Sequence, residues 1–149
     1  MRAVVQRVSR ARVTVAGEVV GDMGPGLLAL VGVGTDDGPD DASRLAEKLV
    51  HLRVFEDPEG RMNQSLLETG GALGVVSQFT LFGDVRRGRR PSFGDAAKPE
   101  DAERLIEALV AEARLLGVAV ATGRFRARME VELVNHGPVT ILLDTRGQF

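Results

Sequence analysis

A strict alternation of apolar and charged residues from Arg124 to Leu133 constrains the fold more than any other feature. Arginine or glutamate fills one set of positions, and apolar residues fill the other set, at Phe125, Ala127, Met129, Val131 and Leu133. Successive side chains of a β-strand point to opposite faces of the sheet. The pattern therefore predicts a long strand with one buried face and one face in water.

Other segments also carry strand patterns, and few helical segments separate them. These strand patterns fall at residues 3–8, 12–15, 18–20, 27–33, 51–55, 73–82 and 139–144. The run from 27 to 33 is continuously apolar, which suits a buried strand. Antiparallel strands follow one another through short turns, whereas parallel strands need a long crossover. The order of the segments therefore predicts largely antiparallel pairing.

Two segments have the one-faced apolar spacing of an amphipathic helix. The first starts at Ala42, after a turn that begins at Gly38, and its apolar positions are Leu45, Ala46, Leu49 and Val50. The second runs from Pro99 to Gly117, with apolar positions at Ala102, Leu105, Ile106, Leu109, Ala113 and Leu116. We therefore predict one α+β domain over residues 1–149, a largely antiparallel, barrel-like β-sheet with two main amphipathic helices.

Composition argues against several kinds of site and partner. The absence of cysteine excludes a disulfide framework, a thiol nucleophile and a thiolate metal site. The two histidines, His51 and His136, lack the spacing of metal ligands, so we expect neither a metal nor a cofactor. No apolar run reaches the ~20 residues that span a bilayer. A net charge of −2 argues against indiscriminate nucleic-acid binding. We expect a cytoplasmic protein with no membrane or DNA partner.

Two short strings carry the chemistry that remains: residues 77–81, Ser-Gln-Phe-Thr-Leu, and residues 135–140, Asn-His-Gly-Pro-Val-Thr. Both offer small hydroxyls, an amide and backbone groups. Ser77 and Thr80 would need a nearby base to act as nucleophiles, and His136 has no visible partner to orient it. The Gly137–Pro138 unit either ends a strand or presents its carbonyls as a rigid pair of acceptors.

A run of arginines follows the first string. It consists of Arg86, Arg87, Arg89 and Arg90. Arginine pairs bidentately with phosphate and stacks on bases, so the run is a candidate nucleic-acid contact. A solvated loop explains it equally well from the sequence alone.

The two strings together resemble the two motifs of the D-aminoacyl-tRNA deacylases. The similarity extends to residues 1–8, 52–57, 61–63 and 90–93, and so covers essentially the whole chain. It implies a homodimeric editing hydrolase that cleaves the ester between a D-amino acid and the acceptor end of tRNA. It also implies activity on glycine mischarged on tRNA-Ala. Arg126 departs from the family pattern, because glycine is usual at its position.

The resemblance also implies roles for individual residues. The catalytic pocket would be lined by Ser77, Gln78, Phe79 and Thr80, with Met129, Asn135 and Thr140 as further pocket residues. Backbone N–H groups near Phe79 and Thr80 would polarise the ester carbonyl, and the 2′-hydroxyl of the RNA would assist.

A Gly137–Pro138 unit with a cis bond would reach into the partner's pocket and reject L-amino acids, with Arg7 as its brace. The four arginines would contact tRNA phosphates. Two alternatives stay open. Thr80 could be a nucleophile, or the chain could be an inactive module of the same fold that binds aminoacyl-RNA or nucleotides.

Overall fold

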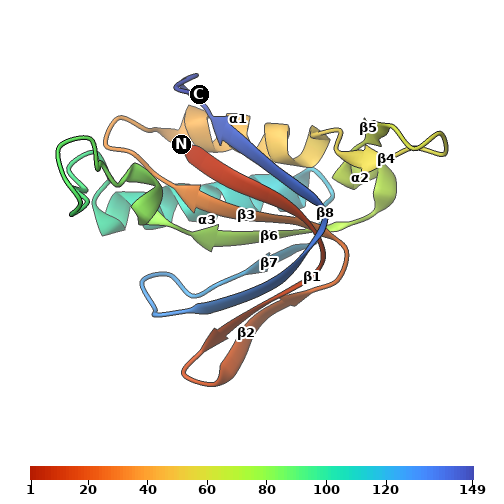
Figure 1. The fold of residues 1–149 in the computed structure, drawn as a ribbon, viewed down its shortest axis with the longest axis horizontal. Helices are drawn as coiled ribbons and strands as arrows, with labels where there is room; N and C mark the ends of the chain where they lie inside the picture. The colour runs from red at the N-terminus through yellow and green to blue at the C-terminus, as the bar shows by residue number, and fades with distance from the viewer.

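A computed structural model describes residues 1–149 as a curved main sheet with helices packed against it and a separate two-stranded sheet (Figure 1). The elements follow in the order β1 (Arg2–Val15), β2 (Glu18–Met23), β3 (Gly26–Gly32), α1 (Pro39–His51), β4 (Phe55–Glu56), β5 (Met62–Gln64), α2 (Leu66–Thr69), β6 (Ala72–Ser77), the 3-10 helix η1 (Phe79–Phe82), α3 (Pro99–Leu115), β7 (Val120–Thr122) and β8 (Glu130–Asp144). The two amphipathic helices predicted from the spacing are α1 and α3, and both are confirmed.

The main sheet is mixed rather than purely antiparallel. Its strands run in the order β2-β1-β3-β6-β7, and β8 pairs with the remaining edge of β1. β1 is antiparallel to β2, β3 and β8, whereas the β3–β6 and β6–β7 pairs are parallel. The parallel pairs arise where α1 and α3 provide the crossovers that such pairing requires. The prediction of a largely antiparallel, barrel-like sheet is therefore confirmed in part.

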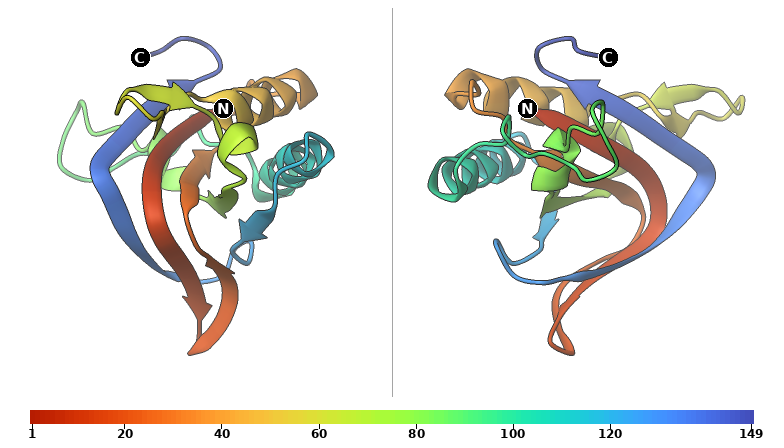
Figure 2. Two further views of the ribbon diagram at one scale, coloured as in Figure 1. Left: turned by 90° about the vertical axis from the view of Figure 1, so that its right-hand side faces the viewer. Right: turned by 60° about the vertical axis from the view of Figure 1, so that its left-hand side comes forward.

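β1 and β8 curve together and nearly close the sheet into a barrel (Figure 2). The first half of β1 pairs with β3 and its second half with β2. The pairing with β8 shifts register twice, between Gln6 and Val8 and between Val8 and Arg10. Such bulges bend a strand and increase its twist. The bend sends the two ends of β8 to different parts of the molecule.

Two apolar clusters hold the sheet and helices together. The larger lies between the sheet and helices α1 and α3, and its fully buried members include Leu27, Leu45, Leu49, Leu73 and Leu109. The smaller fills the curve of the sheet and consists of Val8, Ala11, Val13, Met23, Leu28 and Val76. Burial of apolar surface on this scale is the main favourable term in folding.

Two predicted strands are wrong at their ends. Of the strand expected over 51–55, only Phe55 lies in a strand, β4, because α1 continues to His51 and residues 52–54 form an irregular connection. The strand expected over 73–82 is β6, which ends at Ser77, and the chain then turns into η1. The N–H of Gln78 donates to the Val31 carbonyl at 2.7 Å, and the pairing with β3 stops there.

The alternation that starts at Arg124 also does not begin as a strand. Residues 124–127 form a turn in which the N–H of Ala127 donates to the Arg124 carbonyl at 3.2 Å. β8 begins only at Glu130, and it continues through Pro138 to Asp144 as one strand. The strand expected over 139–144 is thus the second half of β8. Alternating burial persists in the turn because Phe125 and Ala127 face a pocket rather than a sheet neighbour.

Candidate active site

The first string lies where β6 meets η1. Ser77 is the last residue of β6, and Phe79 and Thr80 open the 3-10 helix. The N–H groups at the start of a helix have no partner inside it. Those of Phe79 and Thr80 are therefore available to an oxygen atom of a ligand. The side-chain amide of Gln78 donates to the Thr80 hydroxyl.

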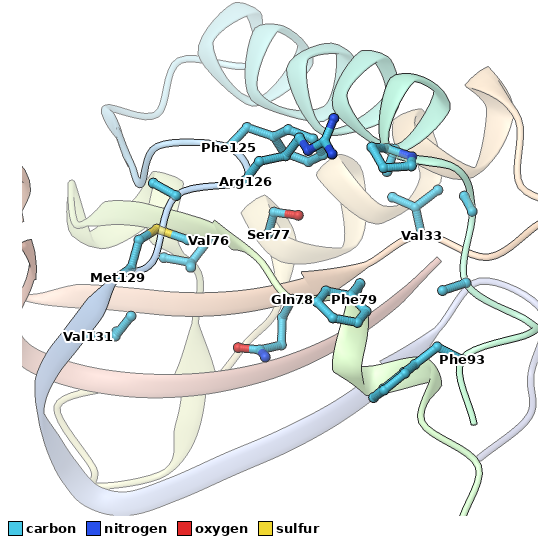
Figure 3. A pocket seen from close by; sticks show the side chains of 15 residues that line it. Val33, Val76, Ser77, Gln78, Phe79, Phe93, Phe125, Arg126, Met129 and Val131 are labelled. Carbon is cyan, nitrogen blue, oxygen red and sulfur yellow. The ribbon is translucent and has the colours of Figure 1, made fainter. Parts of the chain in front are cut away.

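A pocket of about 600 Å³ opens beside this junction (Figure 3). It is mainly apolar, and its walls come from the end of β3, from β6 and η1, from the start of α3, and from the segment that leads into β8. Its lining consists of Val33, Val76, Ser77, Gln78, Phe79, Phe93, Ala96, Ala97, Pro99, Ala102, Phe125, Arg126, Ala127, Met129 and Val131. Concave, mostly apolar sites with a few polar groups are typical of small-ligand binding.

Two aromatic rings lie on one side of the pocket. Phe79 and Phe93 pack edge to face, with ring centroids 4.9 Å apart and planes at 65°. Phe79 is nevertheless 57% exposed. The pocket therefore has an accessible aromatic surface at its opening.

The second string forms a bulged segment inside β8, and the Gly137–Pro138 bond is cis. Asn135 ties the segment together. Its Oδ1 accepts from the Val139 N–H at 2.8 Å, and its Nδ2 donates to the Val139 carbonyl at 3.0 Å and to Oε1 of Gln6 at 3.0 Å. Val139 is buried, whereas Gly137 and Pro138 face outward.

Arg7 supports this segment from β1. Its side chain is only 6% exposed, with Nε donating to the His136 carbonyl at 2.8 Å and Nη1 to the Val54 carbonyl at 2.7 Å. A Cβ on Gly137 would lie 2.7 Å from Val139 Cγ2 and 3.2 Å from Arg7 Nη2. Gly137 also has φ +149°, so close packing and backbone conformation both require glycine there.

The structure brings together only some of the predicted site residues. Ser77, Gln78, Phe79 and Met129 line the pocket, whereas Thr80 sits just outside its lining. Asn135 and Thr140 do not line this pocket within one chain, and their predicted role as pocket residues stays a prediction.

The reason is the path of β8, which lines the pocket up to Val131 and then follows β1 away from it. Gly137 and Pro138 lie on that second half of β8, and neither lines the pocket. Arg7 lies beside them on β1. One chain therefore does not bring its two strings together. Sequence reasoning missed the pocket residues Phe93, Phe125 and Arg126. The resemblance over 90–93 and the alternation from 124 were the available signals.

The arginine run forms an exposed loop closed at its base by Asp84 and Ser92, whose backbones exchange hydrogen bonds of 2.8 and 2.9 Å. Arg86 pairs with Asp84, with Nη2 2.7 Å from Oδ2. Hydrogen bonds from the Arg86 side chain and backbone lower the pKa of Asp84 to about 2. Arg86 lines a polar hollow of about 550 Å³ together with Arg87 and Arg90.

Two further features of the chain bear on function. No group of three or more His, Asp or Glu side chains is arranged to hold a metal ion. No helix has both the length and the apolar character needed to cross a membrane.

Comparisons with known proteins agree with one another. A family model described as D-Tyr-tRNA(Tyr) deacylase matches residues 4–144. A D-aminoacyl-tRNA deacylase from Symbiobacterium thermophilum is 62% identical, with 100% of this chain and 99% of the relative covered. One from Heliobacterium modesticaldum is 58% identical, with 99% and 98% covered.

Solved structures share the fold. One titled c-Myc DNA Unwinding Element Binding Protein has a TM-score of 0.92 and 37% identity, with 97% of this chain and 99% of that chain covered. A probable eukaryotic D-amino acid tRNA deacylase has a TM-score of 0.82 over 95% and 97% of the two chains, and at 19% identity it supports the fold alone. The chain therefore belongs to the D-Tyr-tRNA(Tyr) deacylase family, whose members are hydrolases.

Proposed function

We propose that this chain hydrolyses the ester that joins a D-amino acid to the 3′-terminal adenosine of tRNA, and that it does so in the pocket beside Ser77. Water adds its oxygen to the ester carbonyl carbon, and the bond to the ribose oxygen breaks. The ribose oxygen takes a proton and leaves as a hydroxyl group. The observation that carries the proposal is the free backbone at Phe79 and Thr80 beside a mainly apolar pocket.

Backbone donors supply the first part of the catalysis. As the carbonyl becomes tetrahedral, negative charge develops on its oxygen, and the N–H groups of Phe79 and Thr80 stabilise it. Each donor of this kind is worth about 10²–10³ in rate. Ser77 and Gln78 hold the polar part of the aminoacyl group against the end of β6.

The chain supplies no evident base for the second part. Neither histidine lines the pocket, and no carboxylate does. The 2′-hydroxyl of the terminal ribose lies next to the ester in the substrate itself, so it is suited to assist the attack. Thr80 is the competing nucleophile. Its hydroxyl accepts a hydrogen bond from the Gln78 amide, which lowers its nucleophilicity and argues against that role.

The selection against L-amino acids needs a second copy of the chain. Gly137 and Pro138 are exposed and do not line the pocket of their own chain. Val134 and Leu142 on the same strand are 41% and 56% exposed, an apolar surface that a dimer would cover. We infer a homodimer in which Gly137 and Pro138 enter the pocket of the other copy, bind the α-amino group with their carbonyls and leave no space for an L side chain.

This filter has a chemical consequence for glycine. It acts by excluding a side chain in the L position, and glycine has none. Glycyl-tRNA, including glycine mischarged on tRNA-Ala, therefore passes the filter and is a second substrate. The four arginines of the loop, Arg86, Arg87, Arg89 and Arg90, contact phosphates of the acceptor stem. Arg86 is also oriented by its exposed ion pair with Asp84. The activity removes wrongly charged tRNA and so belongs to translation quality control in the cytoplasm.

The decisive experiment is parallel deacylation of D-tyrosyl-tRNA and L-tyrosyl-tRNA at catalytic concentrations of the protein, with a chelator present. Rapid loss of the D-ester alone supports the activity and the chiral choice. Loss of both esters keeps the hydrolase and refutes the filter. If neither ester is lost, the chain is a binding module, and binding of tRNA or DNA becomes the measurement to make.

A matched variant tests the filter separately. Gly137→Ala places a methyl group against Val139 and Arg7, so the Gly137–Pro138 segment must shift. We expect hydrolysis of the L-ester to rise relative to the D-ester. Gly147→Ala is the control, because Gly147 also has positive φ but has open space around its Cβ position. An unchanged ratio of L-ester to D-ester hydrolysis in Gly137→Ala would show that the Gly137–Pro138 segment does not select substrates.

A further inference from the structure

Arg126 adopts a backbone conformation that side-chain-bearing residues rarely take. Its φ is +64°, and the only other non-glycine residue with positive φ is Ala16. Ala16 lies in the tight turn that joins β1 and β2, where such a conformation is common. Arg126 lies instead in the turn before β8, at the pocket. Residues held in strained conformations cluster at functional sites, so Arg126 calls for a functional explanation.

Arg126 is also the only charged side chain among the residues that line the pocket. Figure 3 shows it beside Phe125, on the side of the pocket opposite Gln78 and Phe79. The pocket contains no aspartate or glutamate that could pair with it. The ion pairs of this chain use other arginines, including the nearby Arg124, whose Nη2 lies 3.9 Å from Glu18.

We propose that Arg126 binds the phosphate attached to the 5′ oxygen of the substrate's terminal adenosine. The inference rests on the proposed function. The same ribose carries both the ester and this phosphate, so it is the anion nearest to the reacting bond. A guanidinium matches a phosphate with two parallel hydrogen bonds. Arg126 is exposed at the pocket, so its guanidinium is accessible to a phosphate of the substrate. The Arg87 to Arg90 loop then contacts phosphates further along the strand.

The test compares three substrates: D-tyrosyl-tRNA, 3′-O-(D-tyrosyl)adenosine 5′-monophosphate and 3′-O-(D-tyrosyl)adenosine, which lacks the phosphate. Arg126→Gly removes the side chain while suiting the positive φ, so the turn is kept. Because a hydrogen bond between charged groups contributes strongly to binding of the transition state, we expect its loss to lower kcat/KM about ten- to a hundredfold on the two phosphorylated substrates. On the adenosine ester, kcat/KM stays unchanged.

Salt dependence gives a second readout that a purely structural role would not move. Losing one phosphate contact to a single strand reduces the slope of log(kcat/KM) against log[salt] for D-tyrosyl-tRNA by about 0.7. Arg128→Gln is the matched control, because Arg128 is exposed in the same segment and does not line the pocket. In Arg128→Gln, the ratio of kcat/KM on the adenosine 5′-monophosphate ester to kcat/KM on the adenosine ester stays at its wild-type value.

The outcomes distinguish failure of the Arg126 phosphate contact from failure of the proposed deacylase activity. Equal losses on all three substrates, or no loss on any, overturn the phosphate contact while the wild-type activity upholds the proposed function. A wild-type protein that hydrolyses none of the three substrates overturns both. A selective loss on the phosphorylated substrates, together with the reduced salt slope, supports Arg126 as a substrate-binding residue.

Discussion

Replacing Arg7 by methionine tests the support of the Gly137–Pro138 segment most directly. Methionine fills much of the same volume but donates no hydrogen bond, so the carbonyls of Val54 and His136 lose their partner. Val54 is 6% exposed, and leaving a buried acceptor unpaired costs about 1–3 kcal/mol. His136 is exposed, so water replaces part of the second bond.

The two effects together predict a loss of about 2–4 kcal/mol in the free energy of unfolding. Burial of the guanidinium opposes part of this loss, because a buried charge is itself unfavourable. For a chain of this length the loss corresponds to a fall in Tm of about 4–16 °C. The measurement is denaturant unfolding and calorimetry at one fixed protein concentration, since association would make Tm depend on concentration.

Arg10→Met is the matched control on the same strand. Arg10 pairs with Glu132 at 2.8 Å, but both side chains are more than half exposed. Exposed ion pairs contribute little, so this variant changes the unfolding free energy by less than about 1 kcal/mol. Equal stability losses in the two variants would show that the buried hydrogen bonds of Arg7 do not carry the effect. Arg7→Met with wild-type discrimination between D- and L-esters would refute its role as a brace.

Three further outcomes follow from the same structure. Leu49→Ala removes a fully buried side chain from the larger cluster and should cost about 2.7–5 kcal/mol by denaturant unfolding, and a loss below about 1 kcal/mol would contradict that packing. Burial raises the pKa of Asp41, but hydrogen bonds from Thr145 and Gly38 and nearby positive charges outweigh it, so the pKa lies below 3.8. Asp41 therefore stabilises the fold fully above about pH 3.8, and this stabilisation is lost as the pH falls further. Asp41→Asn should reduce the loss of unfolding free energy on acidification below that pH. Thr80→Ala should keep kcat within about tenfold, whereas a substrate ending in 2′-deoxyadenosine should react at least about a hundredfold more slowly; the reverse result would make Thr80 the nucleophile.

The sequence by itself determined the local elements whose pattern is repeated along the chain. The helices α1 and α3 were predictable because their apolar residues recur every three to four positions and proline stands in the first turn of each. The strand β3 was predictable because its residues form a continuous apolar run. Such a run is typical of a strand that is covered on both faces and therefore has no polar face. Ser77 and Phe79 were recognisable through a string that resembles a family motif.

Tertiary structure decided the features that depend on which segments meet. The alternation at Phe125 suggested a strand, yet its apolar residues face a pocket whose other walls come from β3, β6 and α3. The parallel pairs of β6 follow from the crossovers through α1 and α3. The two helices were predictable locally, but which strands they bring side by side was decided by the tertiary structure.

Burial of charge gives the clearest contrast. Arg7 is an arginine in a strand, which local preference would leave in water. It is buried because its guanidinium donates to the carbonyls of His136 in β8 and Val54 before β4. These residues lie 129 and 47 positions away from Arg7 in the sequence. A local sequence window holds no information about such distant partners. The sequence therefore identified the functional groups of each string, whereas the bend of β8 along β1 keeps the two strings apart within one chain.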